Sequence, residues 1–300
     1  MGDIDLEHLS FRLTDKQRMR RVTIADLDVK SEHMVKNMGK YGVYLKLHNK
    51  NIDKGTIIYR YIKVEYLNKT IREGKLFVPN IQKFEDVRET KGLREAIKDI
   101  PELRPIPDHW MRQYKNRIMR TLNLCALCWT TDNRLNGLPD ESFLMWKSYS
   151  LQKSNISEGE NALYRIEPYC RIETTIGKLI ESLVAKTHDI VISDVIYGET
   201  HELNDYEYLL FRKSIYFEQE QEIRMAVLSK NPKGTLLKVN VEKLLEDADI
   251  IVSPFALKDD KNIEELRKLC ETIKGVKVIP SNILLNIDGA YNEKYASFLR

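Results

Sequence analysis

The segment from Phe217 to Leu228 constrains the fold of this chain more than any other part of the sequence. In an extended strand alternate side chains share a face, so charged and apolar residues here would separate onto two sides. The charged side would carry Glu218, Glu220, Glu222 and Arg224. The apolar side would carry Ile223, Met225 and Val227. This alternation predicts a half-buried strand of an antiparallel sheet.

The predicted strands and helices follow one another in no regular alternation. Runs of β-branched and aromatic residues predict strands at 56–61, 122–130, 162–166, 190–197, 220–228, 235–240 and 250–252. Periodic apolar positions predict helices at 64–73, 109–120, 141–151, 174–186, 202–213 and 263–274, with Gly74 ending the first. The mixed order indicates an α+β fold with a mixed, mainly antiparallel sheet, and disfavours a doubly wound parallel sheet.

The N-terminal part shows a helical pattern of its own. Met34, Met38, Tyr41 and Leu45 recur at steps of three and four, which is the spacing of one helix face. A polar stretch that ends at Gly55 closes this part. We therefore expect an N-terminal helical extension over residues 1–54 and an α+β core domain over residues 55–300.

Length and composition predict a soluble chain in a reducing compartment. With 300 residues, of which 42% are hydrophobic, the chain can bury a full core without a metal or a disulfide. The four cysteines are few for this length, which is typical of cytoplasmic proteins. The apolar stretches are far shorter than the roughly 20 residues of a membrane-spanning helix, and no signal-peptide pattern is present. We expect a cytoplasmic protein that does not enter a membrane.

The sequence lacks the common motifs for metal and dinucleotide binding. Cys125 and Cys128 form a CxxC pair in an apolar run, but no second pair completes a zinc site, so no metal is expected. The six histidines are scattered, and neither a glycine-rich dinucleotide fingerprint nor a P-loop is present.

Basic residues are concentrated in the first half of the chain. Residues 1–150 carry 28 Lys and Arg against 20 Asp and Glu, whereas the remaining residues carry 20 against 25. A predicted helix contributes Arg112, Lys115, Arg117 and Arg120 to this excess. Such a run contacts nucleic acid in some proteins and is a solvated helix face in more of them. A nucleic-acid partner is compatible with this charge and is not required by it.

The charged face of the segment Phe217–Leu228 has two interpretations. It can be the solvated face of an ordinary antiparallel strand. Alternatively, three carboxylates on one face repel each other unless a cation, a base or a ligand hydroxyl lies between them, and Arg224 relieves only part of this repulsion. Crowding also raises a carboxylate pKa, which suits a general base or a group that stabilises a cation.

Two further segments offer side chains to a ligand. Arg60 stands between Tyr59 and Tyr61 on a predicted strand, where a guanidinium can hold phosphate or carboxylate while the rings stack on a base. Alternatively, the tyrosines are ordinary strand aromatics and Arg60 faces solvent.

The second segment is the predicted helix at 141–151. Phe143, Trp146 and Tyr149 have the spacing of a buried helix face, so core packing is the first interpretation. Ser148 and Tyr149 could also offer their hydroxyls to a cleft.

Several short motifs follow one another in a fixed order along the chain. The first half contributes Tyr59-Arg60-Tyr61, Gly74–Pro79, Phe84-Glu85-Asp86, Cys128-Trp129-Thr130 and Met145-Trp146-x-x-Tyr149. The second half contributes Val195-Ile196-Tyr197, Phe211-x-Lys213, Phe217-x-x-Glu220-x-Glu222-x-Arg224 and Val252-Ser253-Pro254. This order resembles a bacterial family, the domain of unknown function numbered 2971. The likeness extends over residues 56–285, although the family's early Asn-Asp-Pro signature appears only as Lys83-Phe84-Glu85-Asp86.

This family is distantly similar to ADP-ribosyltransferases, so the resemblance implies their fold and NAD as the substrate. It implies that Glu222, assisted by Glu220, is the catalytic carboxylate at an oxocarbenium-like transition state, with Arg224 as a structural counter-charge. The residues implied in NAD binding are Arg60 for the phosphates, then Tyr59, Tyr61, Trp146, Ser148 and Tyr149 around the ribose or nicotinamide.

Relatives in this family often accompany phage-defence or abortive-infection genes. The resemblance therefore implies a bacterial toxin or defence effector with ADP-ribosyltransferase or NAD glycohydrolase activity, acting on a protein or nucleic-acid acceptor. The alternative is a non-catalytic sensor or scaffold, in which the N-terminal helices bind a partner and the charged strand is structural.

Overall fold

A single large sheet forms the core of the part of the chain that the structure describes. The computed structural model describes residues 34–47, 49, 51–84, 123–131, 142–153, 164–184, 186–198, 208–213, 215–229, 231, 233–256 and 260–283. In spatial order the nine strands of the sheet are β1 (Met34–Met38), β2 (Tyr41–Lys46), β9 (Ile190–Asp194), β12 (Glu222–Leu228), β5 (Leu124–Thr131), β3 (Ile57–Lys63), β8 (Tyr169–Thr175), β14 (Asp249–Val252) and β15 (Lys277–Pro280). The pairs β2–β9 and β14–β15 are parallel, and the other neighbours are antiparallel. The α+β prediction with a mainly antiparallel sheet is confirmed.

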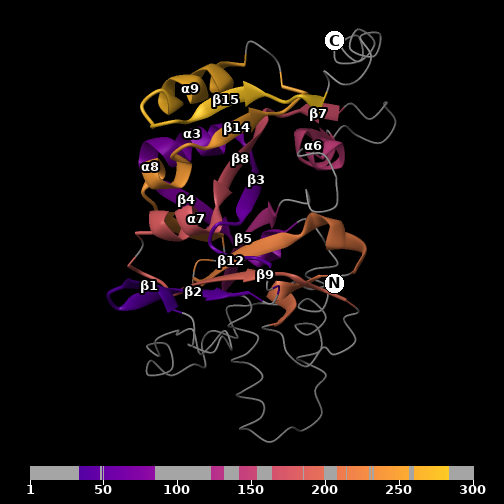
Figure 1. The fold of residues 1–300 in the computed structure, drawn as a ribbon. Coiled ribbons are helices and arrows are strands. Elements are labelled where there is room, and N and C mark those ends of the chain that lie inside the picture. Colours follow the sequence, from indigo (N-terminus) through magenta and orange to yellow (C-terminus); the bar gives the residue numbers. More distant parts are fainter. Residues whose placement is uncertain are drawn as a thin grey trace, which may run out of the picture.

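Helices cover the two faces of this sheet unequally. Four of them, α3 (Val64–Glu73), α7 (Ile176–Ser182), α8 (Val241–Leu245) and α9 (Lys261–Cys270), place buried side chains in the largest apolar cluster. Helix α6 (Phe143–Ser150) packs against the opposite face, where Trp146 joins a smaller cluster with Tyr169, Ile251 and Phe255 (Figure 1). A further buried cluster on this face joins Ala126 and Ala226 of the sheet to Leu210 and Phe211.

Three two-stranded ribbons flank the large sheet. They pair β4 (Lys75–Pro79) with β13 (Gly234–Lys238), β6 (Leu151–Lys153) with β7 (Tyr164–Ile166), and β10 (Ile196–Tyr197) with β11 (Arg212–Lys213). Short 3-10 segments lie at η3 (Ile81–Lys83), η6 (Tyr208–Phe211) and η7 (Ile215–Glu220). The ribbon β10–β11 and the segment η7 lie beside β12, the strand that carries the charged pattern.

Several elements lie where the sequence predicted them. Helix α3 spans Val64–Glu73, and Gly74 ends it with a φ of 61° and an N–H bond to the Thr70 carbonyl. A left-handed φ costs glycine little, which is why glycine is favoured at this position. The strands predicted at 56–61, 122–130 and 250–252 are confirmed within one or two residues, and α6 and α9 occupy the helices predicted at 141–151 and 263–274.

The helix expected across Met34, Met38, Tyr41 and Leu45 is wrong. These residues form the hairpin β1–β2, whose turn contains Gly39 with a φ of 80°. Strand β2 then pairs in parallel with β9, so residues 34–46 belong to the main sheet and not to a separate helical extension. Residues 1–33 lie outside the described part of the chain.

Four other predictions differ from the structure or lie beyond it. The helix expected from residue 174 begins at Ile176, because the preceding residues form β8, which was not predicted. The strand expected at 220–228 begins at Glu222, and its first two positions belong to other conformations. The helix expected at 109–120, with Arg112, Lys115, Arg117 and Arg120, lies outside the described residues. Of the helix expected at 202–213, residues 202–207 also lie outside them, and the described half is wrong because it forms the 3-10 segment η6 and then β11.

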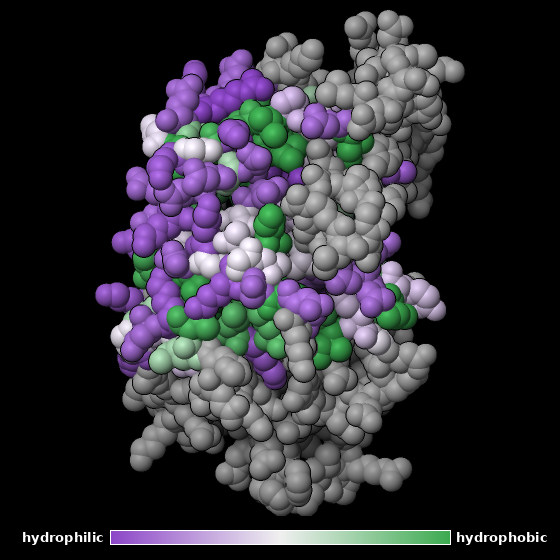
Figure 2. Space-filling view, viewed as in Figure 1, coloured by the Kyte–Doolittle hydropathy of each residue, from purple (hydrophilic) through white to green (hydrophobic). Residues whose placement is uncertain are grey.

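The visible surface is mostly hydrophilic. In Figure 2 hydrophilic side chains cover most of the coloured part of this face, with hydrophobic groups scattered between them. Within the described residues, every helix is too short or too polar to cross a membrane.

The hairpin β1–β2 is joined to α7 by a lysine, which gives a test of its place in the fold. Lys36 Nζ donates to the carbonyls of Ile180, Glu181 and Leu183 at 3.1, 2.6 and 2.7 Å. Because this lysine is partly exposed, we expect Lys36→Met to lower the free energy of unfolding by about 1 kcal/mol in urea denaturation. Lys75→Met on exposed β4 is the control and should change it by less than about 0.5 kcal/mol. Equal losses of unfolding free energy in Lys36→Met and Lys75→Met would contradict this anchoring of the hairpin.

Candidate functional site

Strand register places the carboxylate of Glu222 on the same face of the sheet as Tyr59. Thr130 is paired with Tyr59 on one side and with Glu222 on the other, and directly paired residues of antiparallel strands share a face. Arg224 follows on this face opposite Cys128, whereas Ile223, Met225 and Val227 lie in the apolar cluster behind it. The predicted separation of charged and apolar residues is therefore confirmed from Glu222 onwards.

The chain before Glu222 is not extended, which alters the expected row of carboxylates. Residues Ile215–Glu220 form η7, and Gln221 has a φ of 42°, in the left-handed region that residues other than glycine seldom adopt. The Gln221 carbonyl accepts hydrogen bonds from the Thr131 N–H at 2.9 Å and hydroxyl at 3.0 Å, which hold this bend against β5. Glu218 is exposed on η7, so the prediction that it shares the face of Glu222 on one strand is wrong. Glu220 instead returns toward Glu222.

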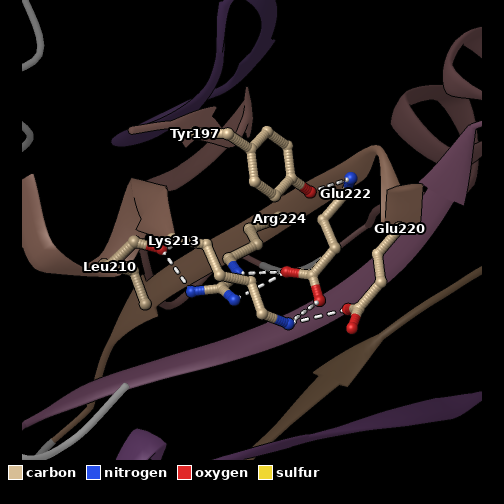
Figure 3. A network of polar contacts seen from close by, with 6 residues as sticks. All are labelled: Tyr197, Leu210, Lys213, Glu220, Glu222 and Arg224. Atoms are coloured by element: carbon tan, nitrogen blue, oxygen red, sulfur yellow. Dashed lines mark hydrogen bonds and ion pairs between the residues drawn. The ribbon is translucent and has the colours of Figure 1, made fainter. Parts of the chain in front are cut away.

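Glu222 is buried and has cations on both of its carboxylate oxygens (Figure 3). Arg224 donates to Oε2 from Nε at 2.7 Å and approaches it with Nη2 at 2.6 Å. Lys213 Nζ lies 3.1 Å from Oε1. Arg224 Nη1 also donates to the Leu210 carbonyl at 2.7 Å, and the guanidinium carbon lies 5.9 Å from the centre of the Phe84 ring. Arg224 is thus the structural counter-charge that the sequence predicted.

Lys213 binds a second carboxylate with the same ammonium group. Its Nζ lies 2.7 Å from Glu220 Oε2, and only 7% of the lysine side chain is exposed. The Phe217 ring lies beneath the ammonium, 4.6 Å from Nζ, and limits water access from that side. Two carboxylates and one lysine therefore form a compact triad, in which Glu220, with 21% of its side chain exposed, is the most accessible acid.

The environment moves the pKa values of the two carboxylates in opposite directions. Burial raises the pKa of Glu220 to about 7, and its hydrogen bond with the Glu222 carboxyl adds to the rise against the opposing effect of Lys213. Burial also opposes ionisation of Glu222, but Arg224 and Lys213 outweigh it and lower the pKa of Glu222. Glu222 therefore stays ionised near neutral pH, while Glu220 can gain or lose a proton.

Aromatic side chains cover the same face next to this triad. Tyr61 stacks on Tyr149 with ring centres 5.3 Å apart and meets Trp146 edge-on at 4.8 Å. Trp146 is fully buried, so it supports these rings and does not reach a ligand itself. Tyr149 keeps 36% of its surface exposed, and Ser148 beside it on α6 is also exposed. Of the predicted aromatic contacts, Tyr149 is the most accessible to a bound molecule.

The Arg60 side chain leaves the backbone on the face of the sheet opposite to that of Glu222. It follows Tyr59 and pairs with Ile172 of the apolar cluster, so register separates its backbone position from that of Glu222. Its guanidinium carbon lies 5.8 Å from the centre of the Trp129 ring, where β3 and β5 are no longer paired. Burial lowers the pKa of Arg60 to about 10, and within the described residues no carboxylate lies at ion-pair distance from it. Its Nε is buried without a hydrogen-bond partner.

The charges of Arg60 and of the two carboxylates both affect the pKa of Tyr149. Burial raises the pKa of the Tyr149 hydroxyl, and the charges of Glu222 and Glu220 raise it further, whereas Arg60 lowers it. Arg60 and the two glutamates therefore act on the same tyrosine hydroxyl, although they do not contact each other. Tyr59, in contrast, is buried beneath the Arg171 guanidinium, 4.3 Å from its ring centre.

Some members of the site could not be assigned from the strand pattern. The Tyr197 hydroxyl accepts the Glu222 N–H at 2.8 Å, and Lys213 comes from a separate ribbon. The only sequence signal for Lys213 is its place in the motif Phe211-x-Lys213. Within the described residues no group of three His, Cys, Asp or Glu side chains could hold a metal ion. Cys125, Cys170 and Cys270 are buried thiols, and Cys128 is partly exposed opposite Arg224.

Comparisons with known proteins do not assign a family or a function to this site. A scan against protein-family models and a search of curated proteins found no match to the chain. The likeness to the domain of unknown function numbered 2971 therefore stays a prediction.

The burial of Glu222 makes the stability of this region depend on Arg224. Removing one partner of a buried ion pair leaves an uncompensated charge, so we expect Arg224→Met to lower the free energy of unfolding by about 3 to 5 kcal/mol. The matched control is Arg72→Met, which breaks an exposed ion pair with Glu265 and should cost less than about 1 kcal/mol. Urea denaturation followed by tryptophan fluorescence measures both. A loss for Arg224→Met no larger than the control would contradict the importance of the network.

Proposed function

We propose that the protein cleaves the nicotinamide–ribose bond of NAD and transfers ADP-ribose to water or to an acceptor, as an effector in a bacterial conflict with phage. The observation that carries the proposal is the pair of adjacent carboxylates, Glu220 and Glu222, which share the Lys213 ammonium at 2.7 and 3.1 Å and lie within electrostatic reach of Tyr149. One ionised and one titrating carboxylate are the groups that glycosyl transfer needs.

Arg60 is the residue that fits the phosphates of such a substrate. Its guanidinium has an unpartnered, buried Nε and no carboxylate at ion-pair distance within the described residues. A buried cation without a counter-ion gains free energy from an anionic ligand, and guanidinium matches phosphate geometry. Tyr149 lies within the electrostatic reach of both this cation and the carboxylates, so one molecule that spans Tyr149 could engage both.

In the proposed reaction the C–N bond between ribose and nicotinamide breaks, and its electron pair leaves with nicotinamide. Positive charge develops on the ribose, and the ionised Glu222 with its neighbour Glu220 supplies negative charge near it. Glu220 takes the proton from water or the acceptor nucleophile as the new bond to ribose forms. Because Glu220 is more exposed than Glu222, the proposal gives the proton transfer to Glu220 and the fixed anionic role to Glu222.

A non-catalytic sensor or scaffold is the second candidate, and one observation favours it. Both oxygens of Glu222 are matched by cations and the residue is 7% exposed, as in a purely structural ion network. In this case Glu220→Gln would leave partner binding and cellular activity unchanged, while no NAD turnover would occur.

The proposal predicts that the purified protein releases nicotinamide from NAD and that this requires Glu220. Loss of a general base typically lowers turnover by about 100-fold or more, so Glu220→Gln should do so. Glu222→Gln should also lower turnover, and Arg60→Met should raise the KM for NAD. Release of nicotinamide is followed by chromatography, and transfer by radiolabelled NAD.

Glu218→Gln is the matched control, because Glu218 is a nearby carboxylate that is exposed and outside the triad. It should retain wild-type turnover. Circular dichroism establishes that each variant is folded. Absence of both turnover and NAD binding in the wild type, with likely acceptor classes supplied, would overturn the proposal.

Turnover should rise with pH through neutrality. A base acts only when unprotonated, and Glu220 has a pKa of about 7, so the rate should increase by about tenfold per pH unit below that value and level off above it. The same raised pKa stabilises the folded state when Glu220 is protonated. That contribution is complete below the ordinary value of 4.5 and is lost as the pH rises through about 7. A pH–rate profile that is flat from pH 5.5 to 8 would contradict the assignment of Glu220 as the base.

A further inference from the structure

Lys213 is the one residue that contacts both carboxylates of the pair within the described part of the chain. Its Nζ lies 2.7 Å from Glu220 Oε2 and 3.1 Å from Glu222 Oε1, and it reaches them from β11, outside the main sheet (Figure 3). The Phe217 ring on its other side, 4.6 Å from Nζ, and its burial keep the ammonium in this position. A single buried cation thus serves two adjacent acids.

The two acids depend on Lys213 to different degrees. Glu222 keeps the contacts that Arg224 Nε and Nη2 make with its Oε2 when Lys213 is removed. Within the described residues, Glu220 contacts Lys213 and the carboxyl of Glu222. Loss of Lys213 would therefore leave Glu220 beside a like charge with no cation in contact, a situation that favours the protonated acid.

We infer that Lys213 is a positioning residue, which holds Glu220 against Glu222 and controls the proton of Glu220. This role rests on the proposed function only for its effect on turnover, because control of the Glu220 proton can be measured without a substrate. Through Lys213 the ribbon β10–β11 would take part in the chemistry of the carboxylate on β12.

Other groups that face Glu220 set the background against which Lys213 acts. Glu222 and Arg224 approach from β12, Tyr197 from β10 and Tyr149 from α6, and the pKa values of both tyrosines respond to Glu220. Arg224 is occupied by Glu222 and the Leu210 carbonyl. Lys213 is therefore the cation whose removal changes Glu220 most directly.

The test compares Lys213→Met and Lys213→Arg with the wild type, and Lys238→Met on exposed β13 serves as the control. In the wild type with labelled Glu and Lys side chains, the Glu220 carboxyl and Lys213 ammonium resonances should titrate together near pH 7, and Glu220→Gln should abolish the change at Lys213. In Lys213→Met the Glu220 midpoint should move up by about one pH unit, with turnover at pH 7 about fivefold lower. Lys213→Arg should restore most of both, and Lys238→Met should change neither.

The possible outcomes separate the inferred role of Lys213 from the proposed function. A Lys213 resonance that does not respond to Glu220 in the folded wild type overturns the inference, even where Lys213→Met fails to fold. An unchanged midpoint in a folded Lys213→Met variant overturns it as well. Coupled titration without NAD turnover supports the role of Lys213 in proton control and removes the proposed function, so the two failures are distinguishable.

Discussion

The ionised carboxylate of Glu222 is the constraint around which this half of the molecule is organised. A buried carboxylate is tolerated only when its oxygens are matched, and the matching groups come from β12 itself and from the ribbon β10–β11. Arg224 then fixes the carbonyl of Leu210, and Tyr197 receives the Glu222 N–H. The segment before β11 therefore meets the sheet through polar contacts as well as apolar ones, because Leu210 and Phe211 also lie in a buried apolar cluster with Ala226.

Several elements of the fold could be predicted because the residues within each element determine its conformation. The apolar spacing of α3, its glycine at the C-terminal end and the β-branched run of β3 each select one conformation with little help from the rest of the chain. Met34, Met38, Tyr41 and Leu45 were misleading because a hairpin can also place apolar residues at such intervals, and the turn at Gly39 was given too little weight. Strand β8 was missed because its residues merge with the start of α7.

The site was predictable only in part, since its geometry depends on contacts between distant segments. Periodicity identified Glu222 and Arg224, and the order of motifs singled out Glu220 and Tyr149. It could not show that Gln221 adopts a left-handed conformation, because the carbonyl of Gln221 is held by Thr131, about 90 residues earlier in the chain. Nor could it show that register puts Arg60 and Glu222 on opposite faces, which requires the pairing of β3, β5 and β12.

The insertion of β12 between β9 and β5 has a consequence for biosynthesis. Both neighbours precede β12 in the chain, and β12 pairs with each of them along most of its length. Until the ribosome has delivered residues 222–228, two apolar strands of the future sheet therefore lack a partner on one edge, and such edges are sites of aggregation. During this interval both edges are open to pairing with other chains, and the carboxylate pair comes into being only when the interval ends. A polypeptide interrupted before Glu222 would lack the strand that joins β9 to β5 and, with it, the proposed chemistry.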